Sequence, residues 1–177
     1  MRSKLFLTIT LVFVPVFLFA QHSYVGVKTC GMCHRSEKSG NQLGIWKNSQ
    51  HSKAFETLLT EKADKVAKDK GLKTKASESP ECLKCHVTGY NVDASLLGKK
   101  FKMEDGVQCE TCHGPGSDYK KKSIMEDKDK AIANGLLLYK KPEELCIKCH
   151  NEESPFYKEF KFTEFWDKIK HPISAKN

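Results

Sequence analysis

The chain has 177 residues, with eight cysteines, seven histidines and a formal net charge of +8. This length fits one domain or two small ones, and a hydrophobic content of 39% beside 29% charged residues leaves little apolar material for a core. The composition excludes a multi-span membrane protein, a collagen-like fibre and a coiled coil. It allows a domain in which a bound group supplies part of the buried apolar surface.

The N-terminus has the three-part layout of a secretory signal peptide. Arg2 and Lys4 give a basic start, and the run Leu5–Ala20 is apolar apart from two threonines. This run is shorter than the roughly 20 residues that a membrane-spanning helix needs. We therefore expect residues 1–20 to be a cleaved signal peptide, with a retained anchor as the alternative. Residues 21–177 should then form one exported domain, in the periplasm or on an extracytoplasmic face, and no later run is apolar enough to span a membrane.

All eight cysteines fall in four copies of C-x-x-C-H, the c-type haem attachment pattern. On a helical turn, residues i, i+3 and i+4 share one face, so both thiols can add to one porphyrin while the histidine binds its iron. The fourth copy should be the clearest local helix of the four, because a helix start is indicated by Pro142, Glu143 and Glu144. The expected covalent attachment residues are Cys30, Cys33, Cys82, Cys85, Cys109, Cys112, Cys146 and Cys149, and the expected proximal iron ligands are His34, His86, His113 and His150.

Two other chemistries use paired C-x-x-C motifs. Four-cysteine zinc sites would leave the histidine after every second cysteine without a role. Thiol–disulfide exchange requires a thioredoxin-like pattern, which this sequence lacks. The spacing therefore favours four covalently attached haem c groups. Each oxidised haem adds about one negative charge, because two propionates outweigh the charge on the iron centre, so the basic sequence does not indicate binding to nucleic acid.

Three histidines remain for the distal side of the iron atoms, namely His22, His51 and His171. Four haems with two histidines each would need four, so at least one haem must have another sixth ligand or none. His51 precedes a helical pattern that runs to about residue 71, and we expect it to bind iron, with a solvated helix-start histidine as the alternative. His171 ends a helix predicted for 163–170 with aromatic residues along one face, and Pro172 stops that helix. We expect His171 to bind iron as well.

Further candidates for distal ligands are His22, Met103 and Met125. His22 lies two residues after the expected cleavage site, where chain ends are usually mobile, so a free histidine is the alternative there. A methionine near a haem more often only packs against it.

Two other segments have a recognisable composition. Lysines recur from Lys62 to Lys75 and predict a solvated helix face, with a docking face for an acidic redox partner as the alternative. Gly114-Pro115-Gly116 predicts a tight turn directly after the third motif. Residues 117–130 are charged and should be exposed and partly helical.

The order of these features resembles the tetrahaem cytochrome c-554 family of exported multihaem cytochromes. The matching stretches are Tyr24–Gly26, Trp46–His51, Gly106–Ser117 and a late C-x-x-C-H. The resemblance implies a mainly α-helical fold with long loops, organised around four closely packed haems. It also implies periplasmic electron transfer, a distal ligand at His51 and a precedent for one haem without a sixth ligand. Tyr119 departs from the family, whose members commonly have a histidine there.

An electron carrier is the function that these observations favour over an enzyme. It would pass single electrons between a donor and an acceptor protein, while the chain sets the potential and access of each haem. One alternative is a reductase for nitric oxide, nitrite or peroxide at a haem without a strong distal ligand. The other is a subunit of a haem filament, in which a neighbouring chain donates a ligand.

Overall fold

The computed structural model describes residues 21–172, and the expected signal peptide lies outside these residues. Short helices joined by long loops make up the described chain, whose one pairing between extended segments is an isolated parallel bridge of Tyr24 with Leu97. This confirms the mainly α-helical fold with long loops. The α-helices are α1 (Val27–Cys30), α2 (Gln42–Asn48), α3 (Ala54–Leu58), α4 (Glu61–Asp69), α5 (Pro80–His86), α6 (Cys109–His113), α7 (Lys122–Met125), α8 (Lys128–Ala133), α9 (Glu143–Cys146) and α10 (Phe162–Ile169), and short 3-10 turns lie at Glu37–Ser39, Gln50–Lys53, Ala76–Glu78, Ala94–Leu96 and Met103–Asp105.

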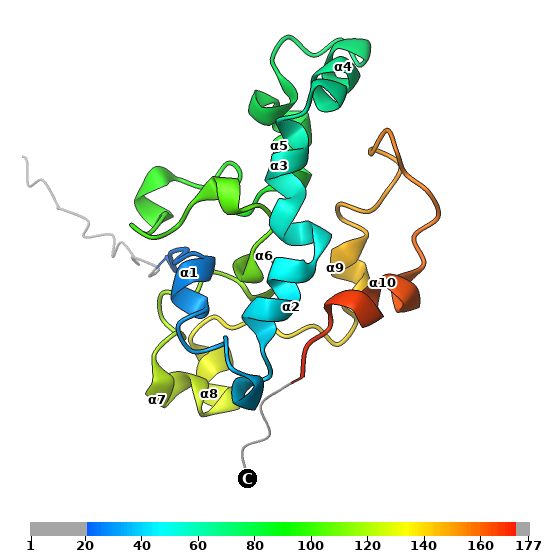
Figure 1. Cartoon of the computed structure of the whole chain (residues 1–177). Coiled ribbons are helices and arrows are strands. Elements are labelled where there is room, and N and C mark those ends of the chain that lie inside the picture. The colour runs from blue at the N-terminus through cyan, green and yellow to red at the C-terminus, as the bar shows by residue number, and fades with distance from the viewer. Residues whose placement is uncertain (1–20, 173–177) are drawn as a thin grey trace, which may run out of the picture.

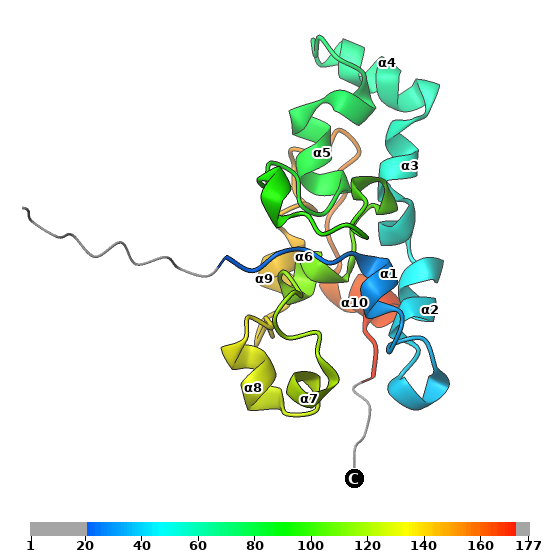
Figure 2. The same ribbon diagram turned by 90° about the vertical axis from the view of Figure 1, so that its left-hand side faces the viewer.

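The helices form an elongated body (Figures 1 and 2). Helices α2 and α3 follow one another along its length, α4 lies at one end, and α7 and α8 lie at the opposite end. Helix α6 lies near the centre and contacts α1, while α5 packs beside α3. Segments from all parts of the sequence therefore meet around the middle of the molecule.

The helix expected up to residue 71 is split in two. Thr60 has an extended backbone, and its hydroxyl accepts a hydrogen bond from the Ala63 amide (3.2 Å), which starts α4 as a new helix. Leu58 of α3 and Ala67 of α4 still pack in one small apolar cluster. The prediction of one continuous helix was wrong because the side chain of Thr60 ends the helical run without disturbing the apolar face.

The four motifs differ in how much of each is helical. The second and third are helical throughout, in α5 and α6, whereas the first and fourth are helical only to Cys30 and Cys146 and continue as turns. The fourth motif, expected to be the clearest helix, is therefore one of the less regular ones, and Pro142 is the residue that precedes α9 as its N-cap.

Helix α10 confirms the helix predicted for 163–170, and α7 and α8 confirm the partly helical character of 117–130.

Apolar burial is slight in the described chain. The buried apolar side chains are Val25, Val27, Leu58, Ala67, Ala76, Val87, Tyr119 and Ala131. Several large apolar side chains lie at the surface instead, such as Leu59 (63% exposed) and Phe156 (60% exposed). So small a core fits a domain whose apolar interior includes a bound group.

A buried carboxylate joins the centre of the molecule. Glu110 is 2% exposed and accepts hydrogen bonds from the backbone amides of Val25 (2.8 Å), Gly26 (2.7 Å) and Gly116 (2.7 Å). A buried carboxylate requires such donors, because burial removes its water. Glu110 therefore ties the N-terminal segment and the turn after α6 to the third motif.

We expect the Glu110→Gln variant to have a free energy of unfolding about 2 kcal/mol lower than the native protein. The Gln side chain replaces one carboxylate oxygen by an NH2 group, which is itself a donor and cannot accept from the backbone N–H groups. Denaturation of the purified protein by guanidinium chloride, followed by circular dichroism, measures this difference. Glu104→Gln is the matched control, since the side chain of Glu104 is exposed. Equal stabilities of the two variants would contradict the role of Glu110.

Candidate functional site

One cavity of about 3460 Å³ contains all of the expected attachment residues. Pockets for a single small ligand measure roughly 300–1,000 Å³, so this cavity has room for several large groups. All eight cysteines line it, and so do His34, His51, His86, His113, His150 and His171.

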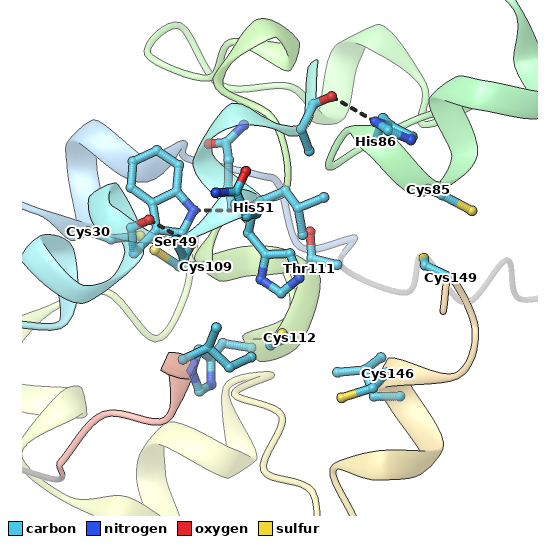
Figure 3. Close-up of a pocket in the computed structure, with 18 of the residues that line it drawn as sticks. Cys30, Ser49, His51, Cys85, His86, Cys109, Thr111, Cys112, Cys146 and Cys149 are labelled. Carbon is cyan, nitrogen blue, oxygen red and sulfur yellow. Dashed lines mark hydrogen bonds between the residues drawn. The ribbon is translucent and has the colours of Figure 1, made fainter. Parts of the chain in front are cut away.

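Cysteines of different motifs meet across this cavity (Figure 3). The neighbouring pairs are Cys30 with Cys109, Cys112 with Cys146, and Cys85 with Cys149. The first motif is therefore next to the third, the third next to the fourth, and the fourth next to the second. All eight cysteines are free thiols.

Burial governs the protonation of these thiols. It raises the pKa of Cys112 to about 11, and together with the nearby Cys85 it raises the pKa of Cys149 to about 12. The hydrogen bond between Cys30 and Cys109 raises the pKa of Cys30, and burial adds to this effect. Cys30, Cys112 and Cys149 are therefore neutral thiols at pH 7, the form that a low-dielectric cavity favours.

Histidines meet in two pairs within the cavity. A metal–nitrogen bond is about 2.0 Å long and a ring centre lies about 1.1 Å from its nitrogen, so two imidazoles on opposite sides of one metal atom have ring centres roughly 6 Å apart. The two observed pairs are His51 with His150, at 6.0 Å, and His113 with His171, at 5.8 Å. Their spacing therefore fits two rings that share one iron. His34 lies near the second pair, where it contributes to lowering the pKa of His113 and of His171, whereas His86 lies against the Ala54 carbonyl.

The protonation of the paired histidines also suits metal binding. Burial lowers the pKa of all four, so these imidazoles are neutral at pH 7. A neutral imidazole is the form that binds a metal ion.

Hydrogen bonds orient two of the motif histidines. The Nδ1 atom of His86 lies 2.7 Å from the Ala54 carbonyl oxygen, and that of His113 lies 3.3 Å from the Leu137 carbonyl oxygen. A carbonyl only accepts, so Nδ1 carries the proton and Nε2 stays free for a metal. Together with the thiols and the paired rings, these contacts show that the residues fit covalently attached haem.

The segment before the third motif holds His51 in place. The Trp46 indole donates a hydrogen bond to the Val107 carbonyl (2.7 Å), and the Val107 amide donates to the His51 carbonyl (3.0 Å). Gly106 has a φ of +76°, and a Cβ atom there would lie 2.7 Å from the His51 carbonyl oxygen. Sequence reasoning missed these contacts, although Trp46, Gly106 and Val107 all belong to the stretches that carry the family resemblance.

The other distal candidates lie in different surroundings. The Nδ1 atom of His22 is 2.7 Å from Asp118 Oδ2, and His22 does not line the cavity. Met103 is likewise outside the cavity lining, whereas Met125 belongs to it. His22 is therefore fixed against Asp118 rather than free.

Tyr119 lines the cavity without offering a free oxygen. Its hydroxyl donates a hydrogen bond to the Gly114 carbonyl (2.7 Å), and the residue is only 7% exposed. Burial raises the pKa of Tyr119, so the hydroxyl stays protonated. A neutral phenol held in this way is not a phenolate ligand for iron.

The lysine-rich end of the molecule contacts the loop after the fourth motif. Lys62 lies over the Phe156 ring at 4.8 Å, Lys84 forms an ion pair with Glu153, and Lys70 donates a hydrogen bond to the Glu153 carbonyl (3.4 Å). The lysines from Lys62 to Lys75 are all exposed, as the prediction of a solvated face requires.

Within residues 21–172, no helix has both the length and the apolar character to cross a membrane.

Part of this sequence matches known proteins. Residues 29–114 match the family described as cytochrome c554 and c-prime, a stretch that includes the first three motifs. A cytochrome c-554 of Nitrosomonas europaea is 34% identical to the chain over 107 residues, which cover 58% of the chain and 43% of that protein. The matched region thus spans less than half of this relative. No solved structure is significantly similar to the chain.

We expect the Trp46→Phe variant to lose about 1 kcal/mol of stability, because an aromatic ring is kept but the Val107 carbonyl loses its donor. For a chain of this size the melting temperature should fall by about 2–4 °C. Trp166→Phe is the matched control, because the Trp166 ring stacks on Phe162 at 5.7 Å and makes no hydrogen bond through its indole nitrogen in the described chain. An equal fall in both variants would show that loss of the indole ring itself, and not this hydrogen bond, is responsible.

Proposed function

Because the chain belongs, through residues 29–114, to the cytochrome c-554 family, we propose that it is an exported c-type cytochrome that carries single electrons between redox partner proteins. Four haem c groups, one at each C-x-x-C-H motif, and a signal peptide at residues 1–20 are part of this proposal. The cavity lined by every motif cysteine and histidine is the observation that carries it. When bound, haem iron supplies the one-electron chemistry.

The chain's own residues have three tasks in this function. The eight motif cysteines attach the groups covalently, and the motif histidines bind from the proximal side. The hydrogen bonds from His86 to the Ala54 carbonyl and from His113 to the Leu137 carbonyl support this assignment, because they direct Nε2 towards the cavity. The small apolar core supports it as well, since macrocycles would fill the interior.

Two distal ligands follow from the paired rings. We assign His51 to the iron whose proximal ligand is His150, and His171 to the iron whose proximal ligand is His113. Ring separations of 6.0 and 5.8 Å support both assignments. Each pair joins two segments that are far apart in the chain. Binding of one iron by both histidines would therefore also hold these segments together.

The contacts between motif thiols support a linear order of the attachment sites. The order runs from the first motif to the third, then the fourth, then the second. Cys30 is hydrogen-bonded to Cys109 and Cys85 to Cys149, and Cys146 lies near enough to Cys112 to raise its pKa. Electrons would enter or leave at the two ends, and the inner two sites would connect them. Partner proteins would then dock near the first and second motifs.

A reductase is the second candidate function. The observation that favours it is that the ring of His86 lies against the Ala54 carbonyl and belongs to neither of the two histidine ring pairs of the described chain. A substrate such as nitric oxide, nitrite or peroxide could then approach from the side opposite this ligand. Turnover assays with these three substrates separate the reductase from the carrier.

We expect the purified protein to contain four haems per chain in a pyridine haemochrome assay. Mass spectrometry of the same sample should show a chain that starts after residue 20 and carries four covalent groups. Fewer than four, or a chain with bound zinc and no covalent group, would contradict the proposal.

We expect His51→Ala and His171→Ala each to convert one low-spin iron to high spin, because each removes one strong ligand. Electron paramagnetic resonance of the oxidised protein counts the converted centres. His22→Ala is the matched control and should leave the spectrum unchanged, since His22 contacts Asp118 outside the cavity lining. A change with His22→Ala, or none with the other two, would contradict the assignments.

A further inference from the structure

Apolar packing holds helix α3 against the second motif. Leu58 of α3 is 5% exposed, and Cys82 and Leu83 of α5 pack against the small cluster that it forms with two alanines. Close packing leaves such a contact little freedom to shift. Ala54 and Thr57 belong to the same short helix as Leu58, so they keep a defined position relative to the second motif.

Two donors converge on one backbone oxygen at this contact. The Ala54 carbonyl oxygen lies 2.7 Å from His86 Nδ1, and it also accepts a hydrogen bond of 2.7 Å from the Thr57 hydroxyl. The hydroxyl oxygen is itself 3.3 Å from His86 Nδ1. All three residues line the central cavity, so this triangle of polar atoms lies beside the site that the second motif forms.

The chemistry of the three atoms sets the direction of each hydrogen bond. A carbonyl only accepts, so both the hydroxyl proton of Thr57 and the Nδ1 proton of His86 point to the Ala54 oxygen. The 3.3 Å separation between hydroxyl and ring is long for an N–H···O bond, whereas the 2.7 Å separation between ring and carbonyl is short. The Thr57 hydroxyl therefore acts on His86 mainly through the carbonyl that the two share.

Sharing makes the carbonyl a weaker acceptor for the ring. Each donor draws on the electron density of the same oxygen, and neighbouring hydrogen bonds polarise one another. A strong acceptor at Nδ1 makes an imidazole more basic and a better donor to a metal at Nε2. The Thr57 hydroxyl reduces this effect, so it leaves His86 a weaker donor. A weaker donor stabilises the oxidised form of an iron less, which favours reduction.

From these contacts we infer that Thr57 is a positioning residue for His86, and that its hydroxyl raises the reduction potential of the iron at the second motif by competing for the Ala54 carbonyl. The inference rests on the proposed function, since it requires a haem attached to Cys82 and Cys85. It goes beyond that function, because it names a residue outside the four motifs that adjusts the potential of one haem. The second motif ends the proposed linear order, so Thr57 acts where electrons enter or leave.

Potentiometric titration of the purified holoprotein, followed by absorption, tests this inference. Valine is close to threonine in shape but has no hydroxyl, and Thr57 is exposed, so Thr57→Val should keep the fold. We expect this variant to shift the reduction equilibrium of one haem about threefold towards the oxidised form, since a neighbouring bond changes a hydrogen bond by roughly 10–30%. At 59 mV for each tenfold change, the midpoint potential of that haem falls by about 28 mV.

Thr57→Ser is the matched control, because it removes a methyl group and keeps the hydroxyl. We expect its potentials to equal those of the native protein. Unchanged potentials in Thr57→Val, or a rise of any one of them, would overturn the inference. An equal fall in Thr57→Ser would overturn it as well, since the cause would then be packing and not the hydroxyl.

Two further measurements assign the shift to the second motif. Mapping of haem-bearing peptides tests the proposed function there, and a Cys82–His86 peptide without haem overturns both proposals. A haem on this peptide without the expected shift overturns only the inference about Thr57. The variant Cys82→Ser/Cys85→Ser should carry three haems, and adding Thr57→Val to it should move none of their potentials. A shift in that background would overturn the assignment to His86.

Discussion

The relative position of the first and third motifs depends on one buried carboxylate. Glu110 lies between the two cysteines of the third motif, and its three amide donors come from the N-terminal segment and from the turn after α6. Gln108 adds a second link, since its side-chain oxygen accepts from the Val27 amide (2.8 Å) and its nitrogen donates to the Lys102 carbonyl (2.7 Å). Both residues are 2% exposed. Hydrogen bonds are directional, so these contacts define distances that loose apolar packing does not.

This reliance on buried polar contacts is connected with the small apolar core. The main apolar cluster, around Leu58, Ala67 and Ala76, lies at the α4 end and away from the third motif. The middle of the molecule is instead a large cavity lined by cysteines and histidines. The side chains of Glu110, Gln108 and Trp46 hold the walls of this cavity through backbone groups. The interior can therefore hold large groups while the surrounding chain keeps a defined shape.

Local patterns in the sequence predicted the parts of this structure that depend on neighbouring residues. The C-x-x-C-H spacing identified the cysteines and histidines that line the cavity, and the periodicity around Trp166 identified α10. The partners of His51 and His171 could not be predicted, because His51 meets a ring almost 100 residues away. Counting histidines predicted only that at least one of four haems would lack a second imidazole. The contact of His22 with Asp118 and the cap at Thr60 also escaped prediction, since both depend on side-chain geometry rather than on periodicity.

The contacts between motif thiols have a consequence for how much of the chain must be present. Along the sequence the second motif precedes the third, yet among the described thiol contacts its neighbour is Cys149 of the fourth. The fourth motif lies beyond residue 114, where the match to the family ends. A chain truncated after the third motif would thus retain three of the four motifs but lose the cysteine next to Cys85. If the four motifs carry haem as proposed, continuity of the electron path would depend on the C-terminal third of the chain.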